Sequence, residues 1–195
     1  MIRALLLVFT PARTWGKIEL EKHSVARVFF RFLLPVLLVS AAGEAWGLIK
    51  FGQEQGPFDR IRTIAPALAL RFEATQSAAT LLILFVGAAL FRVIGASFHR
   101  KHTYTECFAT LAYSLGPLLL VRTLGGLPAL NSWVCWGIGV FLAVAALYRG
   151  ISRLMKPDPS SAIGLYLFCA ALFIAVTGLA NFFTGLVLDE TILRF

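Results

Sequence analysis

The stretch AIGLYLFCAALFIAVTGLANFFTGLVL, residues 162–188, decides the fold because it contains no charged side chain over its whole length. Crossing a bilayer as a helix takes about 20 mostly apolar residues, and every backbone polar group must then find its partner within the segment. Residues 162–188 meet the requirement for length and composition. The stretch therefore predicts a membrane-spanning helix.

The composition of the whole chain indicates the same environment. The chain has 195 residues, of which 58% are hydrophobic and 14% are charged, and its mean hydropathy is +0.80. A soluble domain carries about 25% charged residues, which cover its core. The deficit predicts that lipid covers most of the apolar surface, so that the chain is an integral membrane protein.

Four further windows are long and apolar enough to span a bilayer. They are Val25–Ile49, Thr75–Phe98, Cys107–Leu124 and Leu130–Tyr148. Gly125-Gly126-Leu127-Pro128 predicts a tight helical hairpin, and Lys156-Pro157-Asp158-Pro159-Ser160-Ser161 predicts a loop. The expected fold is all-α, a polytopic membrane helix bundle with five transmembrane helices and a short N-terminal interfacial helix.

The first 24 residues predict a segment that lies along the membrane surface. Thr10-Pro11 favours a helix start, and the helix that follows mixes Trp15, Ile18 and Leu20 with basic residues. The expected organisation is a cytoplasmic interfacial segment over residues 1–24 and a transmembrane domain over residues 25–195.

The stretch from Gly52 to Glu73 is ambiguous. Ile64 to Leu70 is apolar, but charged residues bracket it too closely for a span. An interfacial segment is favoured, and a re-entrant segment is left open. The charged residues are Asp59, Arg60, Arg62, Arg71 and Glu73.

The distribution of Lys and Arg predicts the orientation. Five spans place the chain ends on opposite sides of the membrane, and the more basic side faces the cytoplasm. Arg31 lies inside a span and counts for neither side. The N-terminal side carries Arg3, Arg13, Lys17, Lys22, Arg27, Arg92, Arg100, Lys101, Arg149, Arg153 and Lys156, against Lys50, Arg60, Arg62, Arg71, Arg122 and Arg194 on the other. The N-terminus is therefore expected in the cytoplasm.

Several short motifs occur from Thr10 onward. They are Thr10-Pro11 followed by Trp15; Phe108 and Leu111-Ala112-Tyr113-Ser114-Leu115-Gly116-Pro117-Leu118 in the third span; Leu147-Tyr148-Arg149-Gly150-Ile151 closing the fourth; and Ala162-Ile163-Gly164 opening the fifth. With these motifs the chain resembles the bacterial branch of the Yip domain family, membrane proteins named for eukaryotic relatives that bind Ypt/Rab GTPases. The resemblance implies five helices and a cytoplasmic N-terminus, in agreement with the charge distribution.

The chain departs from the eukaryotic pattern at the point where it enters the membrane. Eukaryotic members carry a longer cytosolic N-terminal region and an Asp-Leu-Tyr-Gly-Pro motif, whereas this chain has Arg31-Phe32-Leu33-Leu34-Pro35 in that region. The difference argues against a GTPase partner. The short architecture favours a bacterial inner membrane, with the C-terminus in the periplasm.

Charged residues inside a span are costly and are therefore candidates for function. They are Arg31, Glu44, Glu106 and Arg122. Arg31 is close enough to the cytoplasmic end of its span for its head group to reach the lipid head groups. Glu44 lies too far along the same helix to reach Arg31, but Arg122 is on the same predicted side. We hypothesise that Glu44 and Arg122 pair between the first and third spans.

Other candidate positions for structure or partner contact are polar or helix-breaking. Pro117 removes a backbone hydrogen bond and predicts a kink near Tyr113, Ser114 and Gly116. In the fifth span Thr177, Asn181 and Thr184 share one face, for which helix packing is favoured over a transport path.

Basic residues on the predicted cytoplasmic side are expected to contact anionic lipid head groups. They are Arg13, Lys17, Lys22, Arg100, Lys101, Arg153 and Lys156.

The sequence contains no recognisable catalytic or phosphate-binding motif. His99 and His102 are separated by Arg100 and Lys101, whose charges disfavour a metal site. No catalytic residue, metal, cofactor or nucleic-acid partner is expected. Three separated cysteines are expected to be small buried packing residues, and they are Cys107, Cys135 and Cys169.

The favoured function is a non-enzymatic membrane component that organises protein partners or lipids, as a Yip-like scaffold or trafficking component. Its expected partners are membrane lipids and either another membrane protein or further copies of itself. The alternative is a transporter or channel for small molecules or lipids, in which the third and fifth spans line a path. An intramembrane enzyme would need catalytic side chains clustered at one depth, which the sequence does not show.

Overall fold

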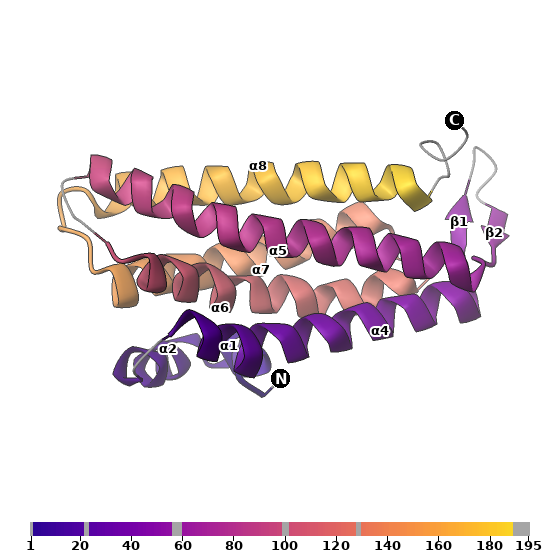
Figure 1. Ribbon diagram of the computed structural model, residues 1–195, viewed down its shortest axis with the longest axis horizontal. Helices are drawn as coiled ribbons and strands as arrows, with labels where there is room; N and C mark the ends of the chain where they lie inside the picture. The colour runs from indigo at the N-terminus through magenta and orange to yellow at the C-terminus, as the bar shows by residue number, and fades with distance from the viewer. Residues whose placement is uncertain (1, 22–23, 56–59, 99–101, 128–129, 189–195) are drawn as a thin grey trace.

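The computed structural model describes residues 2–21, 24–55, 60–98, 102–127 and 130–188 (Figure 1). Five of its helical segments are long and apolar enough to cross a membrane: Val25–Phe51, Pro66–Ser97, Tyr104–Gly126, Ser132–Met155 and Ala162–Val187. The predicted all-α, five-helix membrane bundle is therefore confirmed. The protein is a multi-pass membrane protein.

The elements follow one another in a simple order along the chain. The α-helices are α1 (Ile2–Phe9), α2 (Pro11–Leu20), α3 (Val25–Val28), α4 (Leu34–Phe51), α5 (Pro66–Ser97), α6 (Tyr104–Arg122), α7 (Ser132–Gly150) and α8 (Ala162–Leu188). Two π-helical segments, η1 (Phe29–Leu33) and η3 (Ile151–Met155), and a 3-10 helix, η2 (Thr123–Gly126), extend the spans. The strands are β1 (Gln53–Gln55) and β2 (Arg60–Arg62).

Helix α6 is the central helix of the bundle. In its most apolar window 72% of the residues are buried inside the protein, against 28% in α5 and in α8. Its sequence explains this position, because Thr110, Ser114 and Gly116 would be poor residues to expose to lipid, and small residues allow close helix packing. The long helices α4, α5 and α7 pack against α6, α8 packs against α5 and α7, and all four expose large apolar side chains.

The first span contains a π-turn where its proline requires one. Pro35 cannot donate a backbone hydrogen bond to the preceding turn, and the five residues before α4 adopt π-helical geometry in η1. Arg31 in this segment is exposed. The helix therefore continues through the proline as one span.

The stretch between the first two spans differs from the expected interfacial segment. Strands β1 and β2 pair antiparallel, with Gln53 opposite Arg62 and Gln55 opposite Arg60, and α5 starts at Pro66. The apolar run from Pro66 onward and Glu73 therefore belong to the first turns of the second spanning helix. The charge of Glu73 did not end the helix because the side chain faces an arginine inside the bundle, as described below.

The N-terminal helices fold back onto one end of the bundle, the same end at which α5 connects to α6 and α7 to α8 (Figure 1). Ala4 is completely buried against α6, where a side-chain carbon at Gly116 would lie 3.4 Å from it. Trp15 is also completely buried, next to Gly150 and edge-on to Tyr113. The division into residues 1–24 and 25–195, and contact of the first segment with the membrane surface, stay predictions.

The close approach of α4 to η2 depends on two glycines. A side-chain carbon at Gly47 would lie 2.6 Å from the carbonyl oxygen of Gly126, and one at Gly126 would lie 2.6 Å from the carbonyl oxygen of Glu44. Real side chains do not approach a backbone this closely, so neither position accepts a larger residue without moving a helix.

We therefore expect Gly47→Ala to destabilise the protein by about 1–3 kcal/mol, because the added methyl group forces α4 away from η2. The measurement is thermal unfolding of the detergent-solubilised protein. Gly137→Ala is the matched control, since Gly137 lies in α7 with no atom within 4 Å of the added carbon. Equal behaviour of the two variants would contradict the proposed contact.

Candidate functional site

One face of α4 packs against the end of α6. Ser40, Glu44 and Gly47 are spaced four and three residues apart, which places them on the same side of the helix. The hydroxyl group of Ser40 donates a buried hydrogen bond of 2.7 Å to the carbonyl oxygen of Leu119. This register brings the next polar residue of α4, Glu44, level with Arg122 one turn further along α6.

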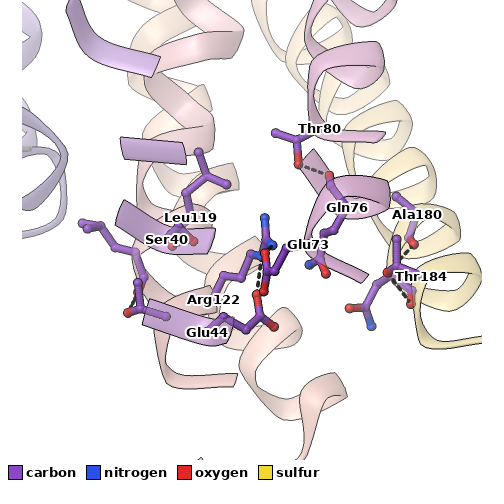
Figure 2. Close-up of polar contacts among 12 residues, drawn as sticks. Ser40, Glu44, Glu73, Gln76, Thr80, Leu119, Arg122, Ala180 and Thr184 are labelled. Atoms are coloured by element: carbon purple, nitrogen blue, oxygen red, sulfur yellow. Dashed lines mark hydrogen bonds and ion pairs between the residues drawn. The ribbon is translucent and has the colours of Figure 1, made fainter. Parts of the chain in front are cut away.

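Arg122 joins three helices through two ion pairs. Its Nε donates to Oε2 of Glu44 on α4, and its Nη2 donates to Oε2 of Glu73 on α5 (Figure 2). At most 8% of any of the three side chains is exposed. We call these residues, Glu44, Glu73 and Arg122, the ion cluster.

The ion cluster is held at a considerable energetic cost. Each buried ion loses several kcal/mol of hydration, which the attraction between the ions offsets only when the geometry is good. Two carboxylates face one guanidinium, so the fully ionised cluster carries a formal charge of −1. Such a group inside a membrane protein is a default candidate for function.

A cavity lies beside the ion cluster, between α5, α6, α7 and α8. Its volume of about 60 Å³ is enough for a few water molecules. Its lining combines apolar side chains such as Ile83 and Leu118 with polar ones. The polar lining comes from Glu44, Gln76, Thr80, Arg122, Ser132, Thr177 and Asn181.

Four buried polar atoms of the ion cluster and the cavity lining have no hydrogen-bond partner among the described residues. They are Oε1 of Glu73, Oε1 of Gln76, Nη1 of Arg122 and Nε1 of Trp136. Two of them are acceptors and two are donors. Because buried polar groups are rarely left unpaired, this arrangement suits the binding of small polar molecules in the cavity, of which water is the simplest.

The sequence as a whole matches one family model. The model describes the Yip1 domain and covers residues 5–180. The chain belongs to the Yip1 domain family. No curated protein and no solved structure gives a significant match to the chain.

The Yip1 domain match spans the resembling motifs, the first four membrane helices and most of the fifth. Its range of residues 5–180 begins inside the N-terminal segment, in agreement with the packing of α1 against α6. The match therefore includes most of the N-terminal segment.

The structure contains the contact between Glu44 and Arg122 that the sequence suggested, and it adds Glu73. Glu73 was missed because it was placed in an interfacial segment. A usable signal was present in the sequence: Glu73, Gln76 and Thr80 are spaced three and four residues apart, which gives one polar stripe at the start of a helix.

The polar stripe of α8 is only partly directed into the cavity. The hydroxyl groups of Thr177 and Thr184 donate to the carbonyl oxygens of Phe173 and Ala180 in their own helix (Figure 2 shows the second bond). Asn181 lines the cavity. The two threonine hydroxyl groups are therefore bonded within their own helix, whereas the hydrogen bonds described for that helix leave the Asn181 side chain free to face the cavity.

The tyrosine-serine-x-x-proline segment of α6 lies in the core, and of its residues Leu115 borders the cavity. The Tyr113 ring packs against Phe32 at 4.5 Å between centroids and meets Trp15 at 6.0 Å. Ser114, Gly116 and Pro117 are buried. In the described part of the chain the Ser114 hydroxyl has no hydrogen-bond partner. These contacts give the segment a packing role, and a role in partner contact stays a prediction.

Glu106 has a local structural role. Its carboxylate accepts a hydrogen bond of 2.9 Å from the backbone N–H of Thr103, and the Thr103 hydroxyl accepts one from the Glu106 backbone. This capping box starts α6. His102 is buried, His99 lies outside the described residues, and no group of three potential metal ligands occurs in the described ranges.

The positions predicted to meet lipid head groups are exposed where they are described. Arg13, Lys17, Arg153 and Lys156 are exposed. The remaining three, Lys22, Arg100 and Lys101, lie outside the described residues.

We expect Arg122→Gln to destabilise the protein by about 3–5 kcal/mol, because it leaves two buried carboxylates without their cation. Thermal unfolding in detergent measures the loss. The exposed Arg92 on α5 supplies the control, and Arg92→Gln should change stability by less than about 0.5 kcal/mol.

A double-mutant cycle with Glu44→Gln isolates the pair. Because the two residues are in contact, the loss in the double variant should be smaller than the sum of the single losses. Strict additivity would show that the side chains do not interact in the membrane-embedded protein.

Proposed function

We propose that this Yip1-domain protein is a non-enzymatic membrane component that organises lipids and protein partners at its cytoplasmic end. In this proposal the N-terminus is cytoplasmic, the C-terminus is periplasmic and the membrane is a bacterial inner membrane. The observation that supports it is the build of α2, which is fixed to the bundle by one face and presents a basic face outward.

The inner face of α2 is anchored by its aromatic residue and its neighbours. Thr14, Trp15 and Ile18 are buried against the end of the bundle. Arg13, Lys17 and Leu20 lie on the opposite side of the helix, and 88% of Leu20 is exposed. A helix that exposes a leucine beside two cations suits the boundary between lipid tails and anionic head groups.

An ion-pair network fixes α2 to the π-helical end of the fourth span. Glu19 contacts Nζ of Lys156 at 2.6 Å and Nη1 of Arg153 at 3.4 Å. Lys156 reaches Glu19 from a left-handed backbone conformation, with φ of 43°. The hydrogen bond from Lys156, reinforced by the charges of both cations, holds the pKa of Glu19 below its usual value. Glu19 therefore stays ionised at neutral pH and keeps α2 in place.

The same end of the bundle gathers exposed cations from several helices. An accumulation of this kind attracts anionic lipid, by about 1 kcal/mol for each basic residue near the surface. The exposed basic residues described at this end are Arg13, Lys17, Arg27, Arg31, Arg92, Arg149, Arg153 and Lys156. An anionic lipid surface or an acidic face of a membrane partner fits this end.

We expect Arg13→Gln/Lys17→Gln to reduce retention of phosphatidylglycerol at least several-fold relative to wild type, because two head-group contacts on a fixed helix are lost. The measurement is native mass spectrometry of protein released from nanodiscs containing phosphatidylglycerol and phosphatidylethanolamine. Lys50→Gln/Arg71→Gln removes the same charge from exposed sites at the opposite end and should leave retention unchanged.

An equal loss of phosphatidylglycerol retention in both double variants would show that only the net charge of the protein matters. That result would contradict a basic lipid-binding end. A membrane protein, or a second copy of the chain, recovered in stoichiometric amount from native membranes and lost in the α2 variant alone would support the organising role through a protein partner.

The cavity beside the ion cluster favours a transporter or channel as the second candidate. If a path passes through it, Asn181→Cys should react with a membrane-impermeant thiol reagent in a background in which Cys107, Cys135 and Cys169 are replaced by alanine. Ala175→Cys, on the exposed surface of the same helix, controls for reaction within the lipid. Protection of position 181 would exclude a water-filled path there.

A further inference from the structure

We propose that Glu44 and Glu73 together hold one proton, so that the ion cluster is a proton-binding site within the membrane domain. This inference is independent of the organising role, since it concerns the opposite end of the bundle from α2 (Figure 1).

The argument begins with charge. Two carboxylates and one guanidinium, all more than nine-tenths buried, carry a formal charge of −1 when all three are ionised. An uncompensated ion in a low-dielectric region costs several kcal/mol, and the uptake of one proton removes that cost. The cluster is electrically neutral only when one of its carboxyl groups is protonated.

Among the residues whose side chains the structure describes, the neighbouring elements supply no second cation. Lys50 on α4 and Arg71 on α5 are exposed, and the Lys50 ammonium lies 5.2 Å from the centre of the Trp46 ring. In α7 the nearest titratable group is the thiol of Cys135, which is neutral at physiological pH. The described parts of η2 and α8 carry no charged side chain.

The distribution of donors and acceptors favours a proton over a metal ion. Nη1 of Arg122 and Nε1 of Trp136 are unpartnered donors that would face a bound metal ion, and a guanidinium repels it. Oε1 of Glu73 and Oε1 of Gln76, one turn further along α5, are both acceptors without a donor in the described part of the chain (Figure 2). A proton on Glu73 supplies a donor where two acceptors otherwise have none.

The cavity gives the proton a route. Arg122 and Gln76 both line it, and its volume accommodates a few water molecules that can relay a proton to the carboxyl groups. Binding transfers one proton from a hydronium ion or water to a carboxylate oxygen. The charge of the cluster changes from −1 to 0, one O–H bond forms as another breaks, and no redox partner is needed.

The test is infrared spectroscopy of the full chain in nanodiscs, titrated upward from neutral pH in H₂O and in D₂O. The C=O stretch of a protonated carboxyl group, which shifts in D₂O, should report about one buried protonated group per chain at neutral pH. Glu73→Gln should lose this band, because the remaining Glu44 is balanced by Arg122 and stays ionised. Glu106→Gln, in the capping box outside the cluster, should keep it.

Absence of the band in the wild-type protein at neutral pH would overturn the proposal. A saturable stabilisation by sodium ions in place of the band would also overturn it, by showing that a metal cation supplies the missing charge. Both measurements on the wild-type chain stand even if a variant fails to fold.

Stability against pH gives a second readout. The folded chain binds one more proton than the unfolded chain, in which both carboxyl groups are ionised, so wild-type stability should fall as pH rises above neutral. Glu73→Gln should remove this part of the dependence, while Glu106→Gln should keep it. Parallel profiles for wild type and Glu73→Gln would contradict a shared proton.

Discussion

Arg122 satisfies two carboxylates that reach it from different helices, and the arrangement of the other helices at this end follows from that requirement. Glu44 fixes the rotation of α4 about its axis, because Ser40 and Gly47 then face Leu119 and Gly126. Glu73 fixes the rotation of α5 in the same way, and with it the positions of Gln76 and Thr80 at the cavity. Buried charges are poor sources of net stability, but they penalise every packing in which they are unpaired. The ion cluster therefore specifies one helix arrangement out of many that a purely apolar bundle would allow.

The opposite end of the bundle is specified by shape. Trp15 fills the space left by Gly150 and contacts Tyr113, and Ala4 packs against Gly116. Several residues of the family-like motifs therefore meet at this place. One end is thus fixed by charge pairing and the other by the fit of large side chains against glycines.

The five spans were predictable because lipid imposes a strong and local constraint: a window of sufficient length without charges has few other structures available. The boundaries of the fifth span agree with the prediction, Ala162–Leu188. The predicted start of the second span was wrong, because the charges of Arg71 and Glu73 ended the apolar window. In the structure Glu73 is paired with Arg122 inside the bundle, and Arg71 is exposed at the end of the bundle. Whether a charge ends a helix depends on a partner far away in sequence, and hydropathy contains no such information. Glu44 and Arg122 could be suggested as a pair because both are charged residues inside spans on the same predicted side of the membrane. Trp136 and Gln76 could not be recognised as cavity residues from the sequence, because their positions depend on the packing of α5, α7 and α8.

The length of α5 has a consequence for the depth of the ion cluster. Its 32 residues extend about 48 Å at 1.5 Å per residue, whereas the hydrocarbon core of a bilayer is about 30 Å thick. A tilt of about 20° absorbs only a small part of the difference, so several ångströms of helix project at each end when the excess is shared. Glu73 lies about 10 Å from the first residue of α5, which places its carboxyl group close to the boundary between lipid tails and head groups. Local bilayer thickness would then decide how deeply the cluster is immersed, so a thicker membrane would surround it with more hydrocarbon and a thinner one would bring it nearer to water.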